Sequence, residues 1–279
     1  MGGRKCFIIK KLSFVVLLSL FSGVLLAQQI QMTEKELKRQ LDSVLMEGNL
    51  LYQYERAAWI SGDLAMQNPN VKAEFKGYLI YEDQGVIKAI ILGENQSVCI
   101  AEYSFENSFD SPKSTIIEKR KLSEKERTLV GVRGKMIENI IRDYSNELVI
   151  QDGYNLNMIL LPFEKKYKLY FMPGTAQNNV IPFGNDYLFI ANKNGKIESW
   201  KKFHSSLIAV KTTDDEGKEI EKVIHSHLIT TPLMTATDIC TFKLYAPAYN
   251  IDVFGVFSPA IGKLMEYSLK KNEISITDF

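Results

Sequence analysis

The strongest constraint on the fold is a change in hydrophobic spacing near Lys76. Before this point, apolar residues recur every three or four positions, which is the period of an amphipathic helix. After it, the apolar runs become short, rich in β-branched and aromatic residues, and separated by Gly, Asn and Asp. Because helices and strands must bury their apolar faces against each other, we expect an α+β protein.

The helical part predicts two consecutive helices. Thr33 is followed three residues later by Glu36, a capping-box pattern that marks a helix start. A second helix is expected from Leu51, in "LLYQYERAAWISGDL", where aromatic residues fall at helical spacing. Core packing is the simplest reading of that aromatic stripe.

The strand-rich part divides at a further helix. The runs "KGYLIYED", "GVIKAIILGE" and "QSVCIAEYSF" predict an antiparallel meander, and Ser123 then caps a helix. The half that follows is mostly strand, interrupted by one helix that starts at Thr235–Asp238 and ends before Pro247. We therefore predict an N-terminal α+β region over residues 28–146 and a C-terminal α+β domain over residues 147–279.

The N-terminus has the layout of a secretory signal. Four basic residues within the first 11 positions precede an apolar run, Leu12–Leu26, and a polar stretch follows Ala27. The run is shorter than the roughly 20 apolar residues of a spanning helix. We expect cleavage after Ala27 and a periplasmic or secreted protein with no stable transmembrane span. The bulky Leu25 leaves an uncleaved anchor open.

Charge and cysteine content exclude several classes of function. The net charge is +1 and the basic residues are scattered, which argues against nucleic acid as a partner. Cys6 lies in the predicted signal, and the remaining Cys99 and Cys240 could pair or be buried as free thiols. Burial is the favoured expectation. No CxxC, GxSxG, phosphate-loop or HExxH motif is present.

The segment "KVIHSHLITTPLMTATDIC" carries the candidate site. Side chains alternate along a strand, so His225 and His227 project to the same side and can share one metal ion. Seven residues follow, and a helix then starts with Thr235 and Asp238 in its first turn. Asp238 is placed to supply a carboxylate ligand, which predicts a zinc site.

The third histidine of the chain, His204, is a less certain ligand. The turn "TTDDEGKE" predicts a hairpin between the strand ending at Lys211 and the strand starting near Ile220. That pairing would place His204 opposite His227. A slip of one residue would turn His204 to the other face.

A second interpretation of the segment involves no metal. Thr235-x-x-Asp238 is itself a capping box, which accounts for both polar residues as helix-end chemistry. The sequence leaves both interpretations open.

The spacing from His225 to Asp238 resembles the His-x-His, seven-residue, Ser-x-x-Asp signature of JAB/MPN (JAMM) metallopeptidases. The resemblance implies that His225, His227 and Asp238 bind zinc and that Thr235 positions water and the oxyanion. The implied activity is a zinc-dependent peptidase or amidase acting on a peptide or protein. The rest of the layout resembles exported bacterial proteins of uncharacterised function that carry a similar "TATDIC" segment.

The family's general base has no equivalent motif in this chain. The base is a Glu on an earlier strand, usually beside a Cys-Gly pair. Asp186, in "PFGNDYLF", is the leading substitute, ahead of Glu164 and Glu198. The alternative function is a non-catalytic envelope binding or structural protein with a degenerate JAMM-like domain.

Overall fold

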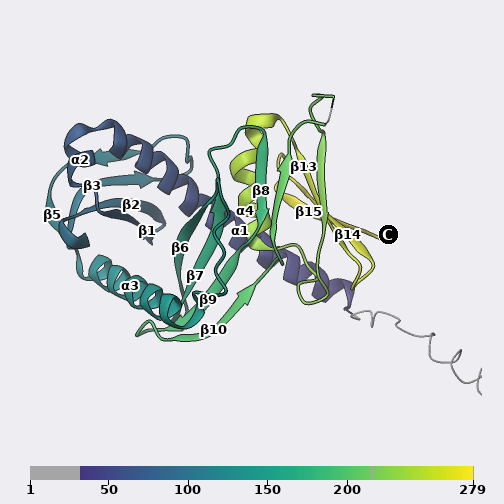
Figure 1. Ribbon diagram of the computed structural model, residues 1–279, viewed down its shortest axis with the longest axis horizontal. Helices are drawn as coiled ribbons and strands as arrows, with labels where there is room; N and C mark the ends of the chain where they lie inside the picture. The colour runs from purple at the N-terminus through teal and green to yellow at the C-terminus, as the bar shows by residue number, and fades with distance from the viewer. Residues whose placement is uncertain (1–31, 215, 279) are drawn as a thin grey trace, which may run out of the picture.

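The computed structural model describes residues 32–214 and 216–278, so the predicted signal segment 1–27 lies outside it. The fold is α+β, as the sequence predicts (Figure 1). Within the described residues, no helix is both long and apolar enough to cross a membrane. The helices are α1 (Glu34–Gln67), α2 (Pro69–Glu74), α3 (Glu124–Tyr144), α4 (Ala236–Tyr245) and the short 3₁₀ turns η1 (Glu94–Gln96) and η2 (Ala246–Tyr249).

The N-terminal sheet is the predicted meander. Its strands are β1 (Gly77–Asp83), β2 (Val86–Gly93), β3 (Val98–Phe105), β4 (Ser114–Ile116) and β5 (Arg120–Lys121). β1, β2 and β3 pair in antiparallel order, and both β4 and β5 pair with β3. α3 starts at the predicted cap, Ser123, and buries its apolar line against this sheet and the next.

Three further sheets form the rest of the molecule. One has the order β10-β9-β7-β6, a second pairs β11 with β8, and the third has the order β12-β13-β14-β15. β12 runs parallel to β13, and the other neighbours are antiparallel. The strands are β6 (Asn155–Phe163), β7 (Lys166–Gly174), β8 (Val180–Gly184), β9 (Tyr187–Asn192), β10 (Ile197–Lys202), β11 (Leu207–Lys211), β12 (Lys222–Ser226), β13 (Val253–Ser258), β14 (Lys263–Ser268) and β15 (Glu273–Asp278).

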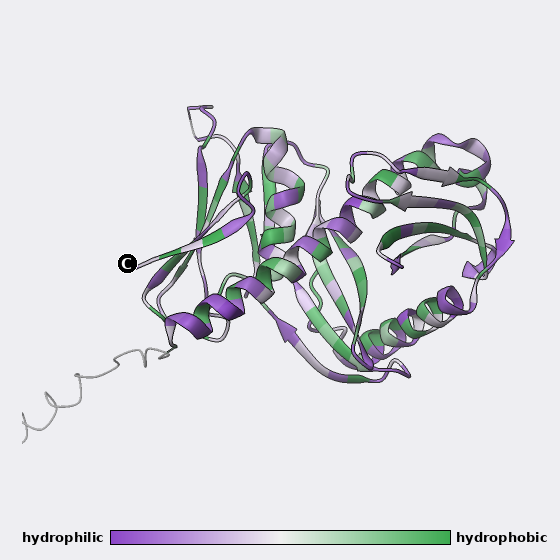
Figure 2. Ribbon diagram, turned by 180° about the vertical axis from the view of Figure 1, so that it is seen from behind, coloured by the Kyte–Doolittle hydropathy of each residue, from purple (hydrophilic) through white to green (hydrophobic). Residues whose placement is uncertain are grey.

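The prediction of two N-terminal helices is wrong, because α1 is one continuous helix of 34 residues. Gly48 sits at the expected junction, and tertiary packing explains its presence there. A Cβ at Gly48 would lie 2.6 Å from the Cβ of Ile239, so only glycine lets α4 approach α1 this closely. α1 crosses the molecule from the C-terminal sheets to the meander, with its most hydrophilic turns near its start (Figure 2).

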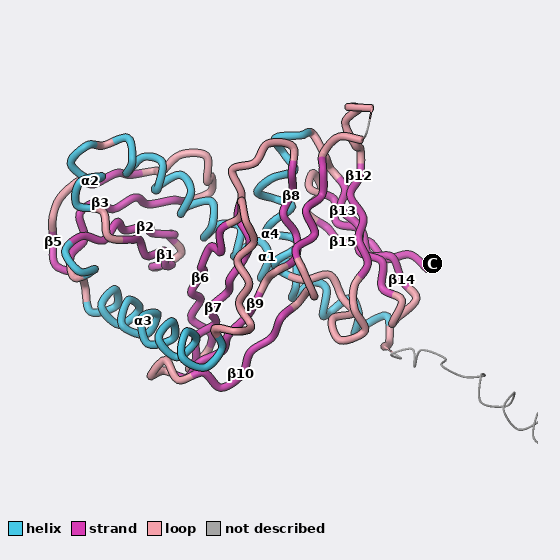
Figure 3. The backbone as a smooth tube through the Cα atoms, in the orientation of Figure 1, coloured by secondary structure: helices cyan, strands magenta, loops and turns pink. Residues whose placement is uncertain are grey.

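The predicted hairpin after Lys211 forms only at its tip. Thr213 and Glu219 make an isolated bridge, but β11 pairs with β8 and β12 pairs with β13. The two strands therefore belong to different sheets (Figure 3). The cross-strand pairing that would bring His204 to His227 is absent, and the register argument for it is wrong.

The hydrophobic core crosses the predicted domain boundary at residue 146. One buried cluster joins Leu51 and Ala89 to Tyr170 and Cys240. A second cluster joins the meander and α3 to β6, β7 and β9. The domain boundary at residue 146 therefore stays a prediction, and the hydrophobic core is continuous across it. Cys99 and Cys240 are buried free thiols, as expected.

Candidate metal site

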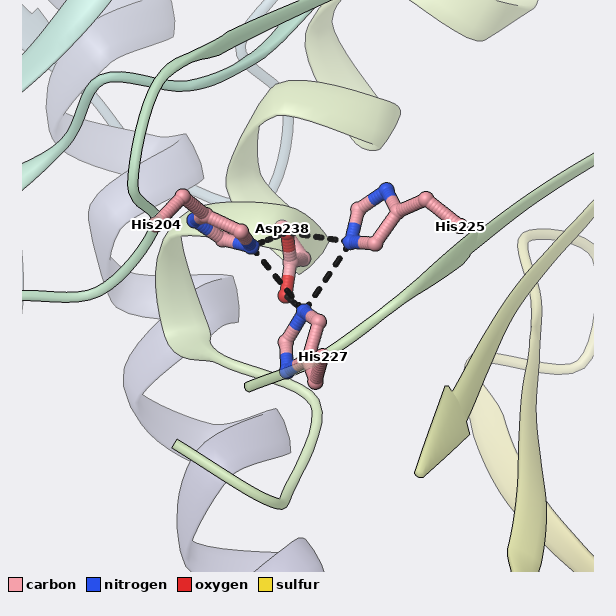
Figure 4. A group of neighbouring side chains, drawn as sticks. All are labelled: His204, His225, His227 and Asp238. Carbon is pink, nitrogen blue, oxygen red and sulfur yellow. Dashed lines mark hydrogen bonds and ion pairs between the residues drawn. The ribbon is translucent and has the colours of Figure 1, made fainter. Parts of the chain in front are cut away.

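His225 and His227 face the same way from the end of β12. His225 lies within the strand, and His227 follows it, with its backbone N–H donating to the Phe257 carbonyl at 2.9 Å. That bond continues the parallel ladder one step past β12 and keeps the alternation of side chains. Both rings therefore point to the first turn of α4, where Asp238 lies (Figure 4).

His204 reaches the same point from the loop between β10 and β11. The Asn185 and Phe203 amides bond to the Ser206 and Asp186 carbonyls, which holds this loop against the end of β8. Gly184 has a φ of 72°, and a Cβ there would collide with the Ser206 carbonyl. A glycine is needed for this close approach. His204 thus arrives by loop packing rather than by the predicted strand pairing.

The four side chains converge at distances that suit one ion. His227 Nε2 lies 2.9 Å from the Nε2 atoms of both His204 and His225. Asp238 Oδ1 lies 3.4 Å from His204 Nε2 and 3.6 Å from His225 Nε2, and Oδ2 lies 3.3 Å from His227 Nε2. Tetrahedral zinc with bonds of roughly 2.0–2.1 Å separates its ligands by about 3.3 Å. The ligand atoms all lie within 4.8 Å of one another, and the four residues could hold a metal ion.

Hydrogen bonds on the far side of two rings fix their tautomers. His204 Nδ1 donates to Asp186 Oδ1 at 2.7 Å, and His227 Nδ1 donates to the Leu233 carbonyl at 2.8 Å. In the neutral ring this leaves the Nε2 lone pair free, and it points into the cluster. Two such lone pairs at 2.9 Å repel each other unless a proton or a metal ion lies between them.

Asp238 and His225 each carry a buried atom without a hydrogen bond. Asp238 Oδ1 has no donor although the residue is only 1% exposed, and His225 Nδ1 has no partner. A buried carboxylate oxygen without a donor is costly. A metal ion at the centre of the cluster would satisfy Asp238 Oδ1, so the donor set fits a bound cation.

The pKa values reflect burial and mutual contact. Burial disfavours the charged form of His204, but the carboxylates of Asp186 and Asp238 outweigh it and raise its pKa to about 9. Burial and the neighbouring imidazoles lower the pKa of His225 to about 4 despite Asp238. Burial raises the pKa of Asp238, but the three histidines outweigh it and hold that pKa well below its ordinary value. Without metal, the cluster therefore holds an Asp238 carboxylate and a protonated His204.

The capping box expected at Thr235 is also present. The Thr235 hydroxyl accepts from the Asp238 amide at 3.1 Å, and Asp238 Oδ2 accepts from the Thr235 amide at 2.8 Å. The Thr235 hydroxyl also lies 2.7 Å from Oδ2. The capping interpretation therefore accounts for Oδ2, but it leaves Oδ1 and the three imidazoles unexplained.

The three candidate bases lie in different places. Asp186 is 1% exposed and contacts His204 through Oδ1 and the Thr237 hydroxyl through Oδ2, so both of its oxygens are engaged. Glu198 pairs with Lys166 at 2.8 Å on the surface of the β10-β9-β7-β6 sheet. Glu164 is exposed in the turn between β6 and β7.

Sequence reasoning missed two groups that hold the ligands. Thr237 bonds to Asp186 and lies 2.8 Å from the Thr235 hydroxyl, which links the α4 cap to the His204 loop. The Leu233 carbonyl orients His227. The pair of threonines at positions 235 and 237 is the sequence signal for the first of these groups. The second is a backbone carbonyl, which leaves no signal in the sequence.

Comparisons with protein families, curated proteins and solved structures found no match to this chain. The likeness to JAMM metallopeptidases therefore rests on the spacing of its motif. Function has to be argued from the site.

Proposed function

We propose that this chain is an exported zinc-binding protein without hydrolytic activity, and that zinc is held by His204, His225, His227 and Asp238. The observation that carries the proposal is the convergence of three Nε2 atoms on a buried Asp238 oxygen that has no hydrogen-bond donor. Its biological setting would be the cell envelope, as a binding or structural protein.

The ligand types support zinc among the common metal ions. Three imidazoles and one carboxylate suit zinc and other late transition metals, whereas magnesium and calcium prefer oxygen donors. Four protein ligands complete a tetrahedron, and closed zinc sites of this kind are structural. His204 occupies the position that water would take in a site built from His225, His227 and Asp238 alone.

A bound zinc ion would supply a cross-link between three segments. His204 comes from the β10–β11 loop, His225 and His227 from β12 and its continuation, and Asp238 from α4. These segments lie in different sheets or layers, and the ion would add to the bonds that Asp186 makes to Thr237 and His227 makes to the Leu233 carbonyl. Zinc would therefore stabilise the C-terminal part of the fold.

Hydrolysis by a JAMM-like peptidase or amidase is the second candidate, and one observation favours it. His225 borders an open surface hollow of about 640 Å³, next to Ile208 and Phe257. A fifth ligand could approach the metal from this side, because zinc sites can expand to five-coordinate. The Thr235 hydroxyl and Asp186 would then be the groups to test in catalysis.

The first test is metal content. Purified protein is expected to hold about one zinc per chain by elemental analysis, and His225→Ala or His227→Ala to lose it, because a remaining set of three ligands binds far more weakly. Asp252→Asn is a control just before β13, at the end of the strand opposite the cluster. Wild-type protein that neither carries nor takes up zinc would overturn the proposal.

The second test separates a closed site from a catalytic one. Cobalt(II) replaces zinc with similar geometry and gives visible absorption bands that report its ligands. In a closed site, azide and acetohydroxamate should leave these bands unchanged, because no ligand position is free. Perturbation by either anion in the wild-type protein would favour the hydrolase.

A further inference from the structure

A second site lies beside the metal cluster without including any of its ligands. A pocket of about 280 Å³, open to solvent on one side, is lined by α1, β7, β9, β10 and the loop before α4. The loop wall runs from Thr231 to Ala236, the same segment that holds His227 through Leu233 and Asp238 through Thr235. α1 contributes Gln40, Val44 and Glu47 to the lining, from the part of the helix that passes the C-terminal sheets (Figure 1).

The pocket carries an excess of positive charge. Glu47 is engaged by Lys168 and by the Tyr170 hydroxyl, the latter at 2.7 Å. Lys201 also lines the pocket and forms no salt bridge in the part of the chain that the structure describes, since the Asp186 carboxylate acts on it only at longer range. Its ammonium lies 5.2 Å from the centre of the Phe203 ring. The Lys201 ammonium is thus the pocket cation that can pair with an anionic group of a ligand.

A buried hydroxyl in the pocket wall has no partner. Thr231 is 4% exposed, lines the pocket, and its Oγ1 makes no hydrogen bond. Buried polar groups are nearly always paired in folded proteins. Because the Thr231 Oγ1 is unpaired, rotation of this side chain toward the pocket breaks no hydrogen bond and lets a ligand donate to it or accept from it.

The remaining walls are aromatic and aliphatic. Tyr170 and Phe203 stack with their ring centres 6.4 Å apart and their planes 7° from parallel. Val44, Leu188 and Met234 are among the other apolar residues that a ligand body would contact. A mostly apolar pocket with a few placed polar groups is the usual form of a small-molecule site.

We propose that this pocket binds a small carboxylic acid with an apolar or aromatic body. The carboxylate pairs with Lys201, the body lies against Phe203 and its neighbours, and a polar group of the ligand bonds to Thr231. The proposal goes beyond zinc binding and does not depend on it.

The probe is N-acetyl-L-phenylalanine, titrated into zinc-loaded full-length protein by calorimetry. We expect saturable binding, and at least tenfold weaker binding of N-acetyl-L-phenylalaninamide, which has the same body without the charge. Equal affinity for the two would refute the role of Lys201. The absence of binding by the acid at its solubility limit would refute the pocket.

Two variants test the residues against a matched control. Lys201→Gln is expected to weaken binding of the acid at least tenfold. Lys202→Gln should leave it unchanged, since Lys202 is on the same strand, lies 5.4 Å from the centre of the Tyr187 ring, and does not line the pocket. Equal losses in both variants would indicate general charge attraction and refute the site.

Thr231→Val distinguishes a ligand contact from a packing role. Because the hydroxyl has no partner in the protein, valine should leave the melting temperature unchanged or raise it, while it weakens the acid severalfold. The measurement is repeated on wild-type protein whose zinc a chelator has removed, because this keeps the His227 bond to Leu233 in the pocket wall. Retained binding there supports the pocket, and its disappearance would place the acid on the metal and refute the pocket.

Discussion

Two helices of this protein begin with the same capping box and use it differently. α3 starts with Ser123 and Glu126, and α4 starts with Thr235 and Asp238. In both, the side chain of the first residue accepts from the backbone of the last, and the carboxylate reaches back to the first amide. Both carboxylates are almost fully buried, at 1% exposure.

The two capping boxes differ in the side chains that surround the carboxylate beyond its cap. Glu126 receives Arg120 on both oxygens at 2.8 Å, the Tyr81 hydroxyl at 2.8 Å and the Ser123 amide at 2.7 Å. Asp238 has its cap on Oδ2, while Oδ1 has no donor and faces the imidazoles of His204 and His225. An arginine completes an ion pair, whereas three imidazole Nε2 atoms and an unpaired oxygen leave room for a metal ion in place of a proton. The capping motif alone therefore does not indicate function.

Metal removal should have the largest effect, and only at the α4 box. At free zinc a hundredfold above its dissociation constant, binding adds about 2.7 kcal/mol to the free energy of unfolding, and a chelator removes it. Hydrogen exchange should then quicken at the amides of His227 and Asp238. The Glu126 amide, bonded to the Ser123 hydroxyl at 3.2 Å, serves as the internal control. If hydrogen exchange quickened equally at both capping boxes, zinc would not act on the α4 box in particular, and the comparison would fail.

Glu126→Gln should give the next largest effect, with metal content intact. Burial raises the pKa of Glu126, but Arg120, Ser123 and Tyr81 outweigh it and lower that pKa from 4.5 to about 2. Because Arg120 is 34% exposed and solvent screens the pair, the difference corresponds to about 2 kcal/mol of stability at pH 7. Urea denaturation of zinc-loaded protein measures the loss. A change below about 1 kcal/mol would show that the Arg120 pair contributes little.

The same carboxylate predicts a pH dependence. Because the folded pKa of Glu126 lies below its unfolded value of 4.5, its contribution is complete above pH 4.5 and is lost as the pH falls to about 2. The stability difference between metal-free wild-type protein and Glu126→Gln should shrink over that window. A difference that stays constant down to pH 2 would assign the effect to packing.

Removal of the cap hydroxyls should give the smallest and most discriminating effects. Ser123→Ala and Thr235→Ala should each cost about 1 kcal/mol in metal-free protein, the usual cost of losing a cap. Only Thr235→Ala should also weaken zinc binding, by roughly 10- to 100-fold, because its hydroxyl orients Asp238. Zinc titration against a competing chelator measures both variants. If the two variants bind zinc with equal affinity, Thr235 serves only as a helix cap.

Local signals predicted most of the elements. The caps at Ser123 and Thr235 and the turns of the meander depend on residues a few positions apart, and the structure has them where the sequence predicts. The continuity of α1 through Gly48 was missed, because the reason for that glycine is Ile239, on a helix almost 200 residues later. The partner of β12 was also missed, because apolar alternation marks a strand but not its neighbour.

By itself, the sequence determined that His225 and His227 share one face and that Asp238 stands in the first turn of a helix, since alternation and capping are fixed by spacing along the chain. Only the tertiary structure decided that His204 joins them, that Asp186 and the Leu233 carbonyl orient the rings, and that Asp238 Oδ1 is left without a donor. These contacts join segments of different sheets and loops. Their geometry depends on register and packing, which no local pattern encodes.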